Sequence, residues 1–490
     1  MTIATRHAEA AVALPEPGML IGGDWVTKTD AGTLDRIDPA TNELLSSFPV
    51  AGPAEVDRAV RAATAAFPAW KRTSVNERRE VLLRIAGLLS DAGPELRQII
   101  ALEGGHPSGV MTVEPSVDWL RYYAGWADKL AGEVVHSYPA RALDYALYEP
   151  YGVVGAIIPW NGPLHVATMK MAPALAAGNC VVLKTPEQSP FAVMRFAQIC
   201  REAGLPDGVL SVLNGGPEVG EAIIRHSGVR KVSFTGGPAI GSKVMALAAE
   251  SLTPVVMELG GKSANLIFAD ADLENAVQMA TTMSAIIAAG QGCLFPTRLL
   301  VQDAVYDEVV ERAKVIAESA PQGDPLDPSV VMGAVIGEAA FDRIMGYIDI
   351  GRNDGTSRLV TGGSRLGGEL ERGFFIKPTI FADVDNSSRI AQEEIFGPVL
   401  SIIRFRDEEE AVAIANDSRF GLAAYLHTKD LSRAHRVADD LDAGWIGVNS
   451  FPAMTPTAPF GGVKASGFGR EGGRAGIEEY VYPKNISILL

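Results

Sequence analysis

The sequence predicts an α/β protein with at least two domains, each built around a parallel sheet with helices on both faces. The chain of 490 residues is long enough for two or three hydrophobic cores. Short apolar strands alternate with helical segments from Gly152 to Leu259, and a second such series runs from Ala264 to Asn449. Alternation of this kind is typical of doubly wound sheets, which bind ligands beyond the carboxyl ends of their strands.

The individual elements follow from periodicity. Residues 53–102 carry apolar side chains three or four positions apart, which predicts helices before the first series. The predicted strands of that series are Val153–Ile158, Cys180–Leu183, Leu210–Leu213, Val232–Phe234 and Val255–Met257, and its clearest helices are Leu164–Leu175 and Phe191–Ala203. The second series begins with a strand at Ala264–Phe268 and ends with one at Gly444–Asn449.

Two segments lie outside both series. Within residues 133–150, apolar side chains at positions 143, 145 and 147 alternate with Asp144 and Ala146, which predicts a half-buried strand. The C-terminal residues 482–490 are also strand-like. Because unpaired apolar strand edges favour association, both segments could pair with a second subunit; alternatively, both pack on their own chain.

Composition excludes several classes of protein. The net charge of −16 argues against a nucleic-acid partner, which would require basic patches. The longest uncharged apolar stretches, such as Tyr151–Met169, are interrupted by proline, asparagine and histidine, so no membrane span is predicted. The first sixteen residues read as a mobile segment rather than a signal peptide. We therefore expect a cytoplasmic protein.

Cysteine and histidine usage narrows the chemistry. The three cysteines are too few and too scattered for a disulfide framework, and Cys180 and Cys200 fall in predicted core elements. The seven histidines are scattered, so no metal site is predicted. Only Cys293 stands in a flexible turn.

Cys293 and Glu258 together indicate covalent catalysis on a carbonyl group. Cys293 ends the turn Gly290–Cys293, and Glu258 stands at the end of an apolar strand. A thiol can add to a carbonyl carbon, and a carboxylate in an apolar site can activate the water that later releases the product. The ordinary alternatives are an inert buried thiol and a buried salt bridge between Glu258 and Lys262.

Three further turns follow predicted strands. Asn161 offers a side-chain amide that can hold a developing oxyanion. Lys184 and Glu187 could contact a phosphate and ribose hydroxyls, and a carboxylate at this place would repel a 2′-phosphate. The glycine-rich turn 234–241 lets backbone amides approach a phosphate, although it lacks the usual Gly-x-Gly-x-x-Gly pattern. Taken singly, these features are better explained as a turn or helix-cap asparagine, a pair of solvated loop charges and an ordinary glycine turn.

Two later loops are less specific. Gln392–Pro398 combines acids with an aromatic residue before a Gly-Pro turn, and Pro459–Lys464 resembles the rim of a pocket, with Phe451 and Met454 before it. Helix ends and loop packing explain both without a function.

The order and spacing of these motifs resemble the NAD(P)-dependent aldehyde dehydrogenase superfamily. The matching segments in chain order are Pro-Trp-Asn, Lys-Thr-Pro-Glu, Phe-Thr-Gly, Glu-Leu-Gly-Gly-Lys, Gly-Gln-x-Cys, Glu-Glu-Ile-Phe-Gly-Pro and Pro-Phe-Gly-Gly. The resemblance extends from about Met19 to the C-terminus, and a collinear set of this size does not arise by chance.

The resemblance implies a role for each matching residue. Cys293 corresponds to the nucleophile, Glu258 to the general base and Asn161 to the oxyanion donor. Lys170 and Glu471 match a proton-relay pair behind the base. The implied cofactor-binding residues are Trp160, Lys184, Glu187, Gly236, Gly237, Leu259, Glu394 and Phe396; the implied substrate-pocket residues are Gly162, Met169, Leu294, Met454 and Phe460.

The resemblance also implies an architecture. The expected fold is aldehyde-dehydrogenase-like α/β, with a Rossmann-type NAD-binding domain from residues 1–127 and 151–260. An α/β catalytic domain covers residues 261–465, and a small β oligomerisation arm comprises residues 128–150 and 480–490. Such an arm implies a homo-oligomer, either a dimer or a tetramer.

The implied reaction oxidises an aldehyde to the carboxylic acid through a thiohemiacetal and a thioester on Cys293, with Glu258 activating water for release. One alternative is a CoA-acylating dehydrogenase, against which Glu258 argues because that chemistry needs no hydrolytic base. The other is a catalytically silent binding protein on the same fold, against which the joint presence of Cys293, Glu258 and Asn161 argues.

Departures from the family pattern bear on specificity. Gly162 stands where many members have a bulky aromatic residue, which predicts a wide pocket for an uncharged apolar or aromatic aldehyde. Gly237 replaces the usual serine, so phosphate binding there would rely on backbone amides. Glu187 favours NAD over NADP, although Lys184 could aid a 2′-phosphate.

Overall fold

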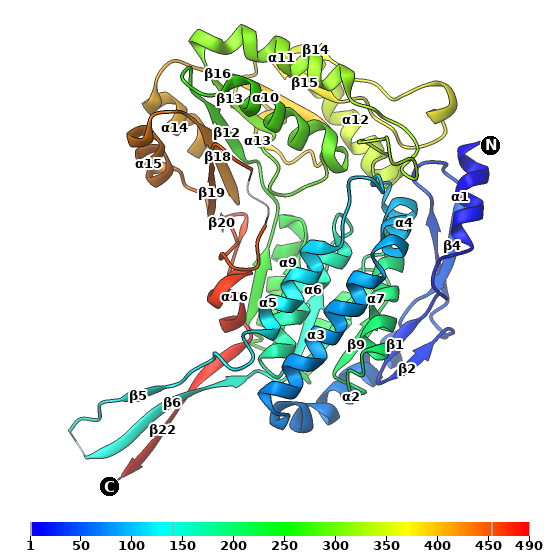
Figure 1. Cartoon of the computed structure of the whole chain (residues 1–490), viewed down its shortest axis with the longest axis vertical. Helices are drawn as coiled ribbons and strands as arrows, with labels where there is room; N and C mark the ends of the chain where they lie inside the picture. The colour runs from blue at the N-terminus through cyan, green and yellow to red at the C-terminus, as the bar shows by residue number, and fades with distance from the viewer. Residues whose placement is uncertain (1, 140, 452–453, 490) are drawn as a thin grey trace.

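The structure, a computed structural model, describes residues 2–139, 141–451 and 454–489. Figure 1 shows two bodies, each formed around a large sheet, and a thin arm that projects from one of them. The strands are β1 (Met19–Ile21), β2 (Asp24–Val26), β3 (Thr33–Ile37), β4 (Leu44–Pro49), β5 (Glu133–Val135), β6 (Ala142–Pro150), β7 (Val153–Ile157), β8 (Cys180–Lys184), β9 (Leu210–Leu213), β10 (Val229–Thr235), β11 (Val255–Glu258), β12 (Ala264–Ile267), β13 (Arg298–Gln302), β14 (Arg358–Thr361), β15 (Thr379–Ala382), β16 (Val399–Phe405), β17 (Phe420–Gly421), β18 (Ala423–His427), β19 (Trp445–Val448), β20 (Val463–Lys464), β21 (Gly467–Phe468) and β22 (Val481–Leu489).

The helices connect these strands. They are α1 (Ile3–Ala11), α2 (Pro53–Arg72), α3 (Val75–Asp91), α4 (Gly93–Gly104), α5 (Glu114–Ala124), α6 (Pro163–Ala176), α7 (Phe191–Glu202), α8 (Pro217–Arg225), α9 (Pro238–Ala249), α10 (Leu273–Thr281), α11 (Tyr306–Ser319), α12 (Glu338–Asn353), α13 (Arg389–Gln392), α14 (Glu408–Asn416), α15 (Leu431–Asp440) and α16 (Gly473–Glu478). A π-helical turn, η1 (Thr282–Ile286), and three short 3-10 turns, η2 (Ile287–Gly290), η3 (Asp303–Val305) and η4 (Gly368–Leu370), complete the set.

The first large sheet has the strand order β2-β1-β9-β8-β7-β10-β11-β21. Strands β7 to β11 are parallel, and β1, β2 and β21 join the two edges in antiparallel fashion. The chain winds outward from β7 to β9 and then returns to continue at β10, so the order reverses between β7 and β10. Such a switch point leaves a crevice at the carboxyl ends of the strands, which is the place expected for a ligand.

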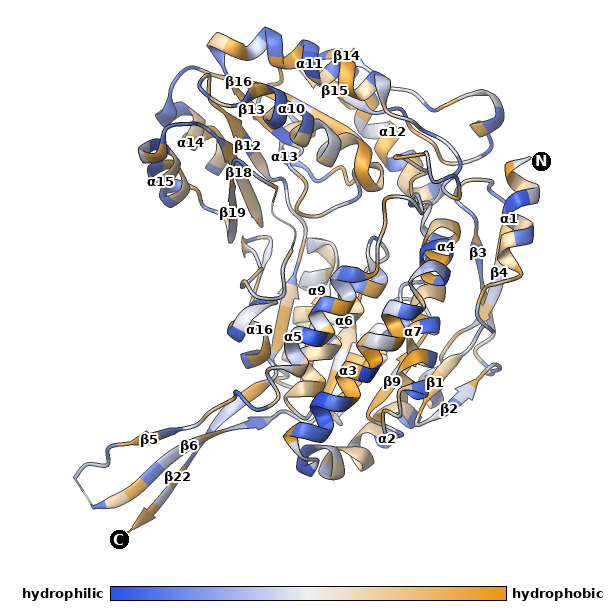
Figure 2. Ribbon diagram, viewed as in Figure 1, coloured by the Kyte–Doolittle hydropathy of each residue, from blue (hydrophilic) through white to orange (hydrophobic). Residues whose placement is uncertain are grey.

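The second large sheet has the order β14-β15-β16-β13-β12-β18-β19, with only β14 antiparallel. Figure 2 shows apolar residues concentrated along the strands of both large sheets, as expected for strands covered on both faces. The α/β class predicted from strand–helix alternation is confirmed.

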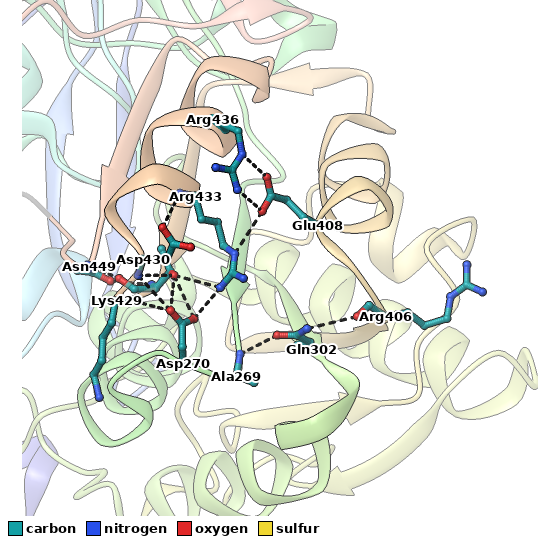
Figure 3. Close-up of polar contacts among 11 residues, drawn as sticks. Ala269, Asp270, Gln302, Arg406, Glu408, Lys429, Asp430, Arg433, Arg436 and Asn449 are labelled. Carbon is teal, nitrogen blue, oxygen red and sulfur yellow. Dashed lines mark hydrogen bonds and ion pairs between the residues drawn. The ribbon is translucent and has the colours of Figure 1, made fainter.

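A network of charges fixes the carboxyl ends of β12 and β18 (Figure 3). Asp270, just after β12, accepts hydrogen bonds from the backbone amides of Lys429 and Asp430, just after β18, and from Arg433 on α15 at 2.9 Å. Arg433 also pairs with Glu408 on α14 at 3.2 Å. The network therefore ties two strand ends to the helices beside them.

The arm is the three-stranded sheet β22-β6-β5. Strand β22 runs antiparallel to β6, from the pair Val481 and Pro150 to the pair Leu489 and Ala142. The 133–150 segment and the C-terminal strand therefore pair with each other within one chain. The predicted strand is confirmed as β6, but its face is less buried than predicted: Tyr145 is half-buried, whereas Leu143 and Leu147 are exposed, because the arm projects away from the body and nothing in the described chain covers it. Ala140 and Leu490 lie outside the described residues.

The N-terminal segment is also different from its prediction. Residues Ile3–Ala11 form α1 instead of a mobile tail, and the Thr2 hydroxyl caps the helix by accepting the Thr5 N–H at 3.2 Å. The buried side chain of His7 anchors the helix against the body. No single-residue pattern in the sequence indicates this anchor, because its partners lie far along the chain.

The sheets are compatible with the predicted domain bounds, which stay a prediction. Strand β21 follows the predicted catalytic domain in sequence, but it pairs with β11 of the first sheet. Gly467 is therefore the neighbour of Glu258 on the adjacent strand. Cys180 and Cys200 are fully buried in the core, as predicted, and within the described residues all three cysteines are free. No helix among the described residues is long and apolar enough to cross a membrane.

Candidate active site

Asn161 and the Cys293 loop meet at the switch point of the first sheet. Asn161 follows β7, and its Nδ2 donates a hydrogen bond to the carbonyl oxygen of Gln291 at 3.2 Å. The two segments are 130 residues apart in sequence, so this contact brings the predicted oxyanion donor to the predicted nucleophile loop. An amide nitrogen carries two hydrogens, which leaves one for a second acceptor.

The backbone before Cys293 is strained. Ala288 and Ala289 both have φ of 49°, and Gly290 has φ of 71°. Residues with a Cβ rarely adopt this left-handed region, and such strain clusters at functional sites when surrounding structure enforces it. The π-helical turn η1 directly precedes this stretch, and Tyr425 fixes the far side by donating its hydroxyl to the carbonyl of Leu294 at 2.9 Å. The loop is therefore held from both ends.

Glu258 is buried without a hydrogen-bond partner. It ends β11, its side chain is 4% exposed, and its Oε1 has no partner within the described residues. A Cβ at Gly461 would lie 2.7 Å from that oxygen, so glycine at this position is what makes room for the carboxylate. Burial raises the pKa of Glu258 well above its usual range, and the nearby Glu471 adds to this effect. The carboxyl group therefore keeps its proton to a higher pH than an ordinary carboxyl group does, which suits a group that exchanges a proton during catalysis.

Lys262 is not the partner of Glu258. Across residues 2–139, 141–451 and 454–489 the two form no ion pair, and the charges that act on Lys262 are Arg298, Glu394 and Glu393. The salt-bridge alternative for Glu258 is therefore wrong.

Lys170 and Glu471 form a fully buried ion pair. Lys170 Nζ lies 2.9 Å from Glu471 Oε1 and also donates to Ser233 Oγ at 2.9 Å. The hydroxyl of Tyr480 contacts the same Ser233 oxygen at 3.2 Å. Burial raises the pKa of Glu471 although Lys170 opposes the shift. Since Glu471 also acts on the pKa of Glu258, these groups form one electrostatic cluster behind the base.

The thiol of Cys293 is neutral at physiological pH in this arrangement. Burial raises its pKa to about 12, and the carboxylates of Glu394 and Glu258 contribute to the rise. No lysine, arginine or histidine is among the groups that act on it. The protein alone therefore does not stabilise the thiolate. Either a bound positive charge has to stabilise it, or a proton acceptor has to remove the proton of the thiol.

A cavity of about 730 Å³ opens at the switch point. Its lining includes the predicted residues Trp160, Asn161, Gly236, Gly237, Leu259, Cys293, Glu394 and Phe396. Gly236 and Gly237 join β10 to α9, and a Cβ at Gly237 would meet nothing within 4 Å. The helix N-terminus, an open glycine turn and the cavity volume suit a ligand with phosphates, such as a dinucleotide.

Glu394 and Phe396 shape one wall of this cavity. Glu394 Oε1 accepts the backbone N–H of Gly261 at 3.0 Å, and a Cβ at Gly260 would collide with the same carboxylate. Phe396 packs edge-on against Trp160 with ring centroids 5.2 Å apart. The two glycines of the Glu-Leu-Gly-Gly-Lys segment therefore allow a carboxylate to approach the nucleophile.

Lys184 and Glu187 do not line the cavity in this structure. Lys184 Nζ pairs with Glu187 Oε2 at 3.3 Å, and burial lowers the pKa of the lysine. Their neighbour Gln188 reaches the cavity wall. The pair therefore stands beside the cavity rather than in it, and Lys184 is buried rather than solvated.

Of the predicted substrate-pocket residues, Gly162 directly follows Asn161 and Leu294 directly follows Cys293. A Cβ at Gly162 would meet nothing within 4 Å, so the space that an aromatic side chain would fill is open. Met169 is buried, Met454 packs against the first core, and Phe460 lies edge-on to Trp445. Leu294 is half-buried in the nucleophile loop. These positions are apolar throughout.

Some functional contacts were missed by sequence reasoning. Ser233, Tyr480 and Tyr425 hold the relay pair and the cysteine loop, yet each stands in or beside an ordinary apolar strand. The only sequence signal for these contacts is a hydroxyl group in or beside a buried strand, because a buried hydroxyl group requires a hydrogen-bond partner. Within the part of the chain that the structure describes, no group of three or more potential metal ligands is found.

The chain belongs to the aldehyde dehydrogenase family. The model of that family matches residues 25–486, which is nearly the whole chain. The fold and the family define an NAD(P)-dependent aldehyde dehydrogenase, and the predicted family and fold are confirmed.

Individual relatives support this assignment. An aldehyde dehydrogenase from Emericella nidulans is 41% identical over 478 residues, covering 96% of this chain and 95% of its own length. A mitochondrial aldehyde dehydrogenase from Homo sapiens is 39% identical, with 98% and 95% covered. Among solved structures, an indole-3-acetaldehyde dehydrogenase from P. syringae in complex with NAD+ and IAA is 38% identical, covers both chains fully and superposes with a TM-score of 0.95.

Proposed function

We propose that this protein oxidises an uncharged apolar or aromatic aldehyde to its carboxylic acid, with NAD+ as the acceptor and a thioester on Cys293 as the intermediate. The observation that carries the proposal is that Asn161 and Cys293 line one cavity and that the buried carboxyl group of Glu258, whose Oε1 has no partner among the described residues, lies close enough to act on the pKa of the Cys293 thiol. Each group has a different task in the two halves of the reaction.

In the first half, the Sγ of Cys293 adds to the aldehyde carbon after losing its proton to water. The carbonyl oxygen becomes an alkoxide, which accepts the free N–H of Asn161 and is stabilised by it. The amide is neutral, so it does not quench the thiolate. When bound in the cavity lined by Trp160, Gly236 and Phe396, NAD+ would provide positive charge near the thiol and would be the hydride acceptor. Loss of the hydride from the tetrahedral carbon leaves a thioester on Cys293.

In the second half, Glu258 removes a proton from a water molecule as that water adds to the thioester carbon. The C–S bond then breaks, the carboxylic acid gives its proton to the departing Cys293 thiolate, and the carboxylate is released. We infer that the buried Lys170–Glu471 pair, whose charges act on the pKa of Glu258, passes the proton from Glu258 to the interior network.

The substrate class follows from the open space at Gly162. We infer that Met169, Met454 and Phe460, the pocket residues that the family resemblance implies, give the region an apolar lining. Phe451 stacks on Tyr425 with 5.0 Å between ring centroids. A bulky uncharged side chain gains most from such surroundings, whereas a carboxylate would be desolvated without a partner.

The preference for NAD over NADP rests on Glu187. Its carboxylate pairs with Lys184 and thereby neutralises the cation that would otherwise attract a 2′-phosphate. We infer that Glu187 turns toward the ribose hydroxyls when the cofactor binds. A strong kinetic preference for NADP would contradict this.

We also infer that the protein is a cytoplasmic homo-oligomer, a dimer or a tetramer. The arm exposes Val134, Tyr138 and Leu489, at 81%, 94% and 78%, which is apolar surface that a second copy would cover. Sedimentation equilibrium of the purified protein measures the assembly, and a monomer at micromolar concentration would contradict the inference.

The function is tested by NADH formation over a panel of aldehydes. Turnover should be fastest with aromatic or long apolar aldehydes, and it should disappear in Cys293→Ala. Cys200→Ala is the matched control, since that thiol is buried in the core and should leave turnover intact. A requirement for CoA, or unchanged turnover in Cys293→Ala, would contradict the proposed reaction.

A further inference from the structure

His7 on the N-terminal helix α1 joins two carboxylates that belong to different bodies of the molecule. Its Nδ1 lies 2.5 Å from Asp38 Oδ2, and its Nε2 lies 2.7 Å from Asp324 Oδ1. Asp38 follows β3 beside the first sheet, and Asp324 follows α11 beside the second. The imidazole is 2% exposed, and the sequence indicated no function for it.

The geometry requires a protonated ring. Ionised carboxylates only accept hydrogen bonds, and a neutral imidazole has a single N–H, so both short contacts are satisfied only by the imidazolium. Asp38 Oδ1 also accepts the N–H of Ala40, and Asp324 Oδ1 accepts that of Leu326, both at 2.8 Å. Both carboxylates are therefore fixed in place.

The same region contains further contacts between the two bodies. Arg36 donates to the carbonyl of Ile336 at 2.9 Å, and the N–H of Phe374 donates to the carbonyl of Pro39 at 2.9 Å. The N–H of Ser108 reaches the carbonyl of Pro325 at 2.8 Å. We call this set of contacts the seam.

The seam forms the outer wall of the cofactor cavity. Arg36, Ile37 and Asn42 line it from one body, and Ile336 and Phe374 line it from the other. Asp38 stands directly after Ile37, so the ion pairs of His7 hold the same loop that faces the cavity. Figure 1 shows α1 beside β4 and α4 at this side of the molecule.

We propose that His7 is a positioning residue for the dinucleotide: by clamping Asp38 to Asp324, it holds the two walls of the cofactor cavity at the spacing that binding requires. This inference rests on the dinucleotide occupying that cavity, as in the proposed function. His7 touches neither cofactor nor substrate, so its loss should weaken cofactor binding more than it slows the chemical steps.

The clamp depends on pH. Burial lowers the pKa of His7, but its hydrogen bonds to Asp324 and Asp38 outweigh this and raise the pKa to about 9. Arg6 also faces Asp324, at 3.1 Å, and Arg36 stands near Asp38. A raised histidine pKa means that the clamp stabilises the protein fully below about pH 6.5 and is lost as the pH rises through about 9.

The test compares His7→Gln with the matched control Glu9→Gln, which changes an exposed residue of the same helix. The dissociation constant for NADH is measured by fluorescence titration of the full-length protein at pH 7.5 and at about pH 10. In His7→Gln at pH 7.5 the constant should rise about fivefold or more, and kcat should change less. The control should match the wild type at both pH values.

The pH dependence of NADH binding by the wild type provides a second readout. Its dissociation constant for NADH should rise from pH 7.5 to about pH 10, and the rise should be much smaller in His7→Gln. An unchanged constant in a folded His7→Gln protein at pH 7.5 would overturn the proposal, even if the variant unfolded at a lower temperature. Failure of the wild type itself to bind NADH would instead count against the proposed function.

Discussion

Glu258 and Glu471 are two buried carboxylates in one cluster, and their surroundings differ in a single respect. Both are almost fully buried, at 4% and 1% exposed, and burial raises the pKa of both. Among the described residues, each carboxyl group has one oxygen without a hydrogen-bond partner, Oε1 of Glu258 and Oε2 of Glu471. Glu471 Oε1, however, pairs with Lys170 Nζ at 2.9 Å, whereas Glu258 forms no ion pair with a described residue.

The presence or absence of a lysine partner separates a structural carboxylate, Glu471, from a reactive one, Glu258. A buried carboxylate with a lysine partner stays ionised and fixed, but a buried carboxylate without one is costly and persists where its reactivity is used. Glu258 Oε1 also lies against Gly461, and the charge of Glu258 acts on the pKa of the Cys293 thiol. The comparison assigns hydrolysis to Glu258 and support to Glu471, and the following changes test that assignment.

Replacing Glu258 should have the largest effect. Glu258→Gln removes the base while keeping the shape, so steady-state turnover should fall by about a hundredfold to ten-thousandfold. The first turnover should persist, because removing this negative charge also lessens the rise in the pKa of Cys293. Rapid-mixing measurements should therefore show a burst of one NADH per active site. Loss of the burst would place Glu258 in the first half-reaction.

Breaking the ion pair between Lys170 and Glu471 should affect the stability of the protein as much as its rate of turnover. Lys170→Met leaves Glu471 buried without its cation, which should cost about 3–5 kcal/mol of unfolding free energy. Urea denaturation of this variant and of the double variant Lys170→Met/Glu471→Gln measures the effect. The double variant should recover part of the loss. If the single and the double variant lose the same unfolding free energy, the interaction between Lys170 and Glu471 does not contribute to stability.

The pH dependence should distinguish the base from the thiol. Hydrolysis needs ionised Glu258, so its rate should rise about tenfold per pH unit below the raised pKa of that carboxyl group and then level off. Stability should move in the opposite direction, since a carboxyl group with a raised pKa favours folding below its ordinary pKa and loses that contribution as the pH rises through the folded value. Single-turnover hydrolysis rates that do not change with pH would contradict the assignment.

Removing the hydroxyl of Tyr480 should have the smallest effect. Tyr480→Phe breaks one contact to Ser233, at 3.2 Å, and should lower the unfolding free energy by about 0.5–1.5 kcal/mol. Turnover should change less than about threefold, because Lys170 retains its bonds to Ser233 and Glu471. A larger loss of turnover would place Tyr480 in the proton path.

Sequence reasoning located the reactive residues better than their partners. The positions of Glu258 at the end of β11 and of the glycine turn before α9 follow from strand–helix alternation, which is a local pattern. Pairing is not local: Lys170 and Glu471 are 301 residues apart, and only the family resemblance joined them. The clamp at His7 spans 317 residues to Asp324, and no motif pointed to it.

The predictions for the arm and for Lys262 failed for the same reason. The alternation in β6 predicted a buried face for Leu143 and Leu147, but burial depends on a covering element, which the arm lacks in one chain. Lys262 stands four residues after Glu258, yet the chain turns toward the second sheet between them and directs the lysine toward Glu394 and Arg298. Spacing along the chain could not reveal either outcome.

Intact-protein and peptide mass spectrometry of Glu258→Gln, stopped shortly after mixing with an aromatic aldehyde and NAD+, tests the central claim most directly. If the thioester forms on Cys293, the Glu258→Gln protein should gain the mass of one acyl group, carried by the peptide that contains Cys293. Neither Cys293→Ala nor a sample without NAD+ should show this acyl product. Absence of the acyl group in Glu258→Gln while NADH is formed, or its attachment to another residue, would contradict the account.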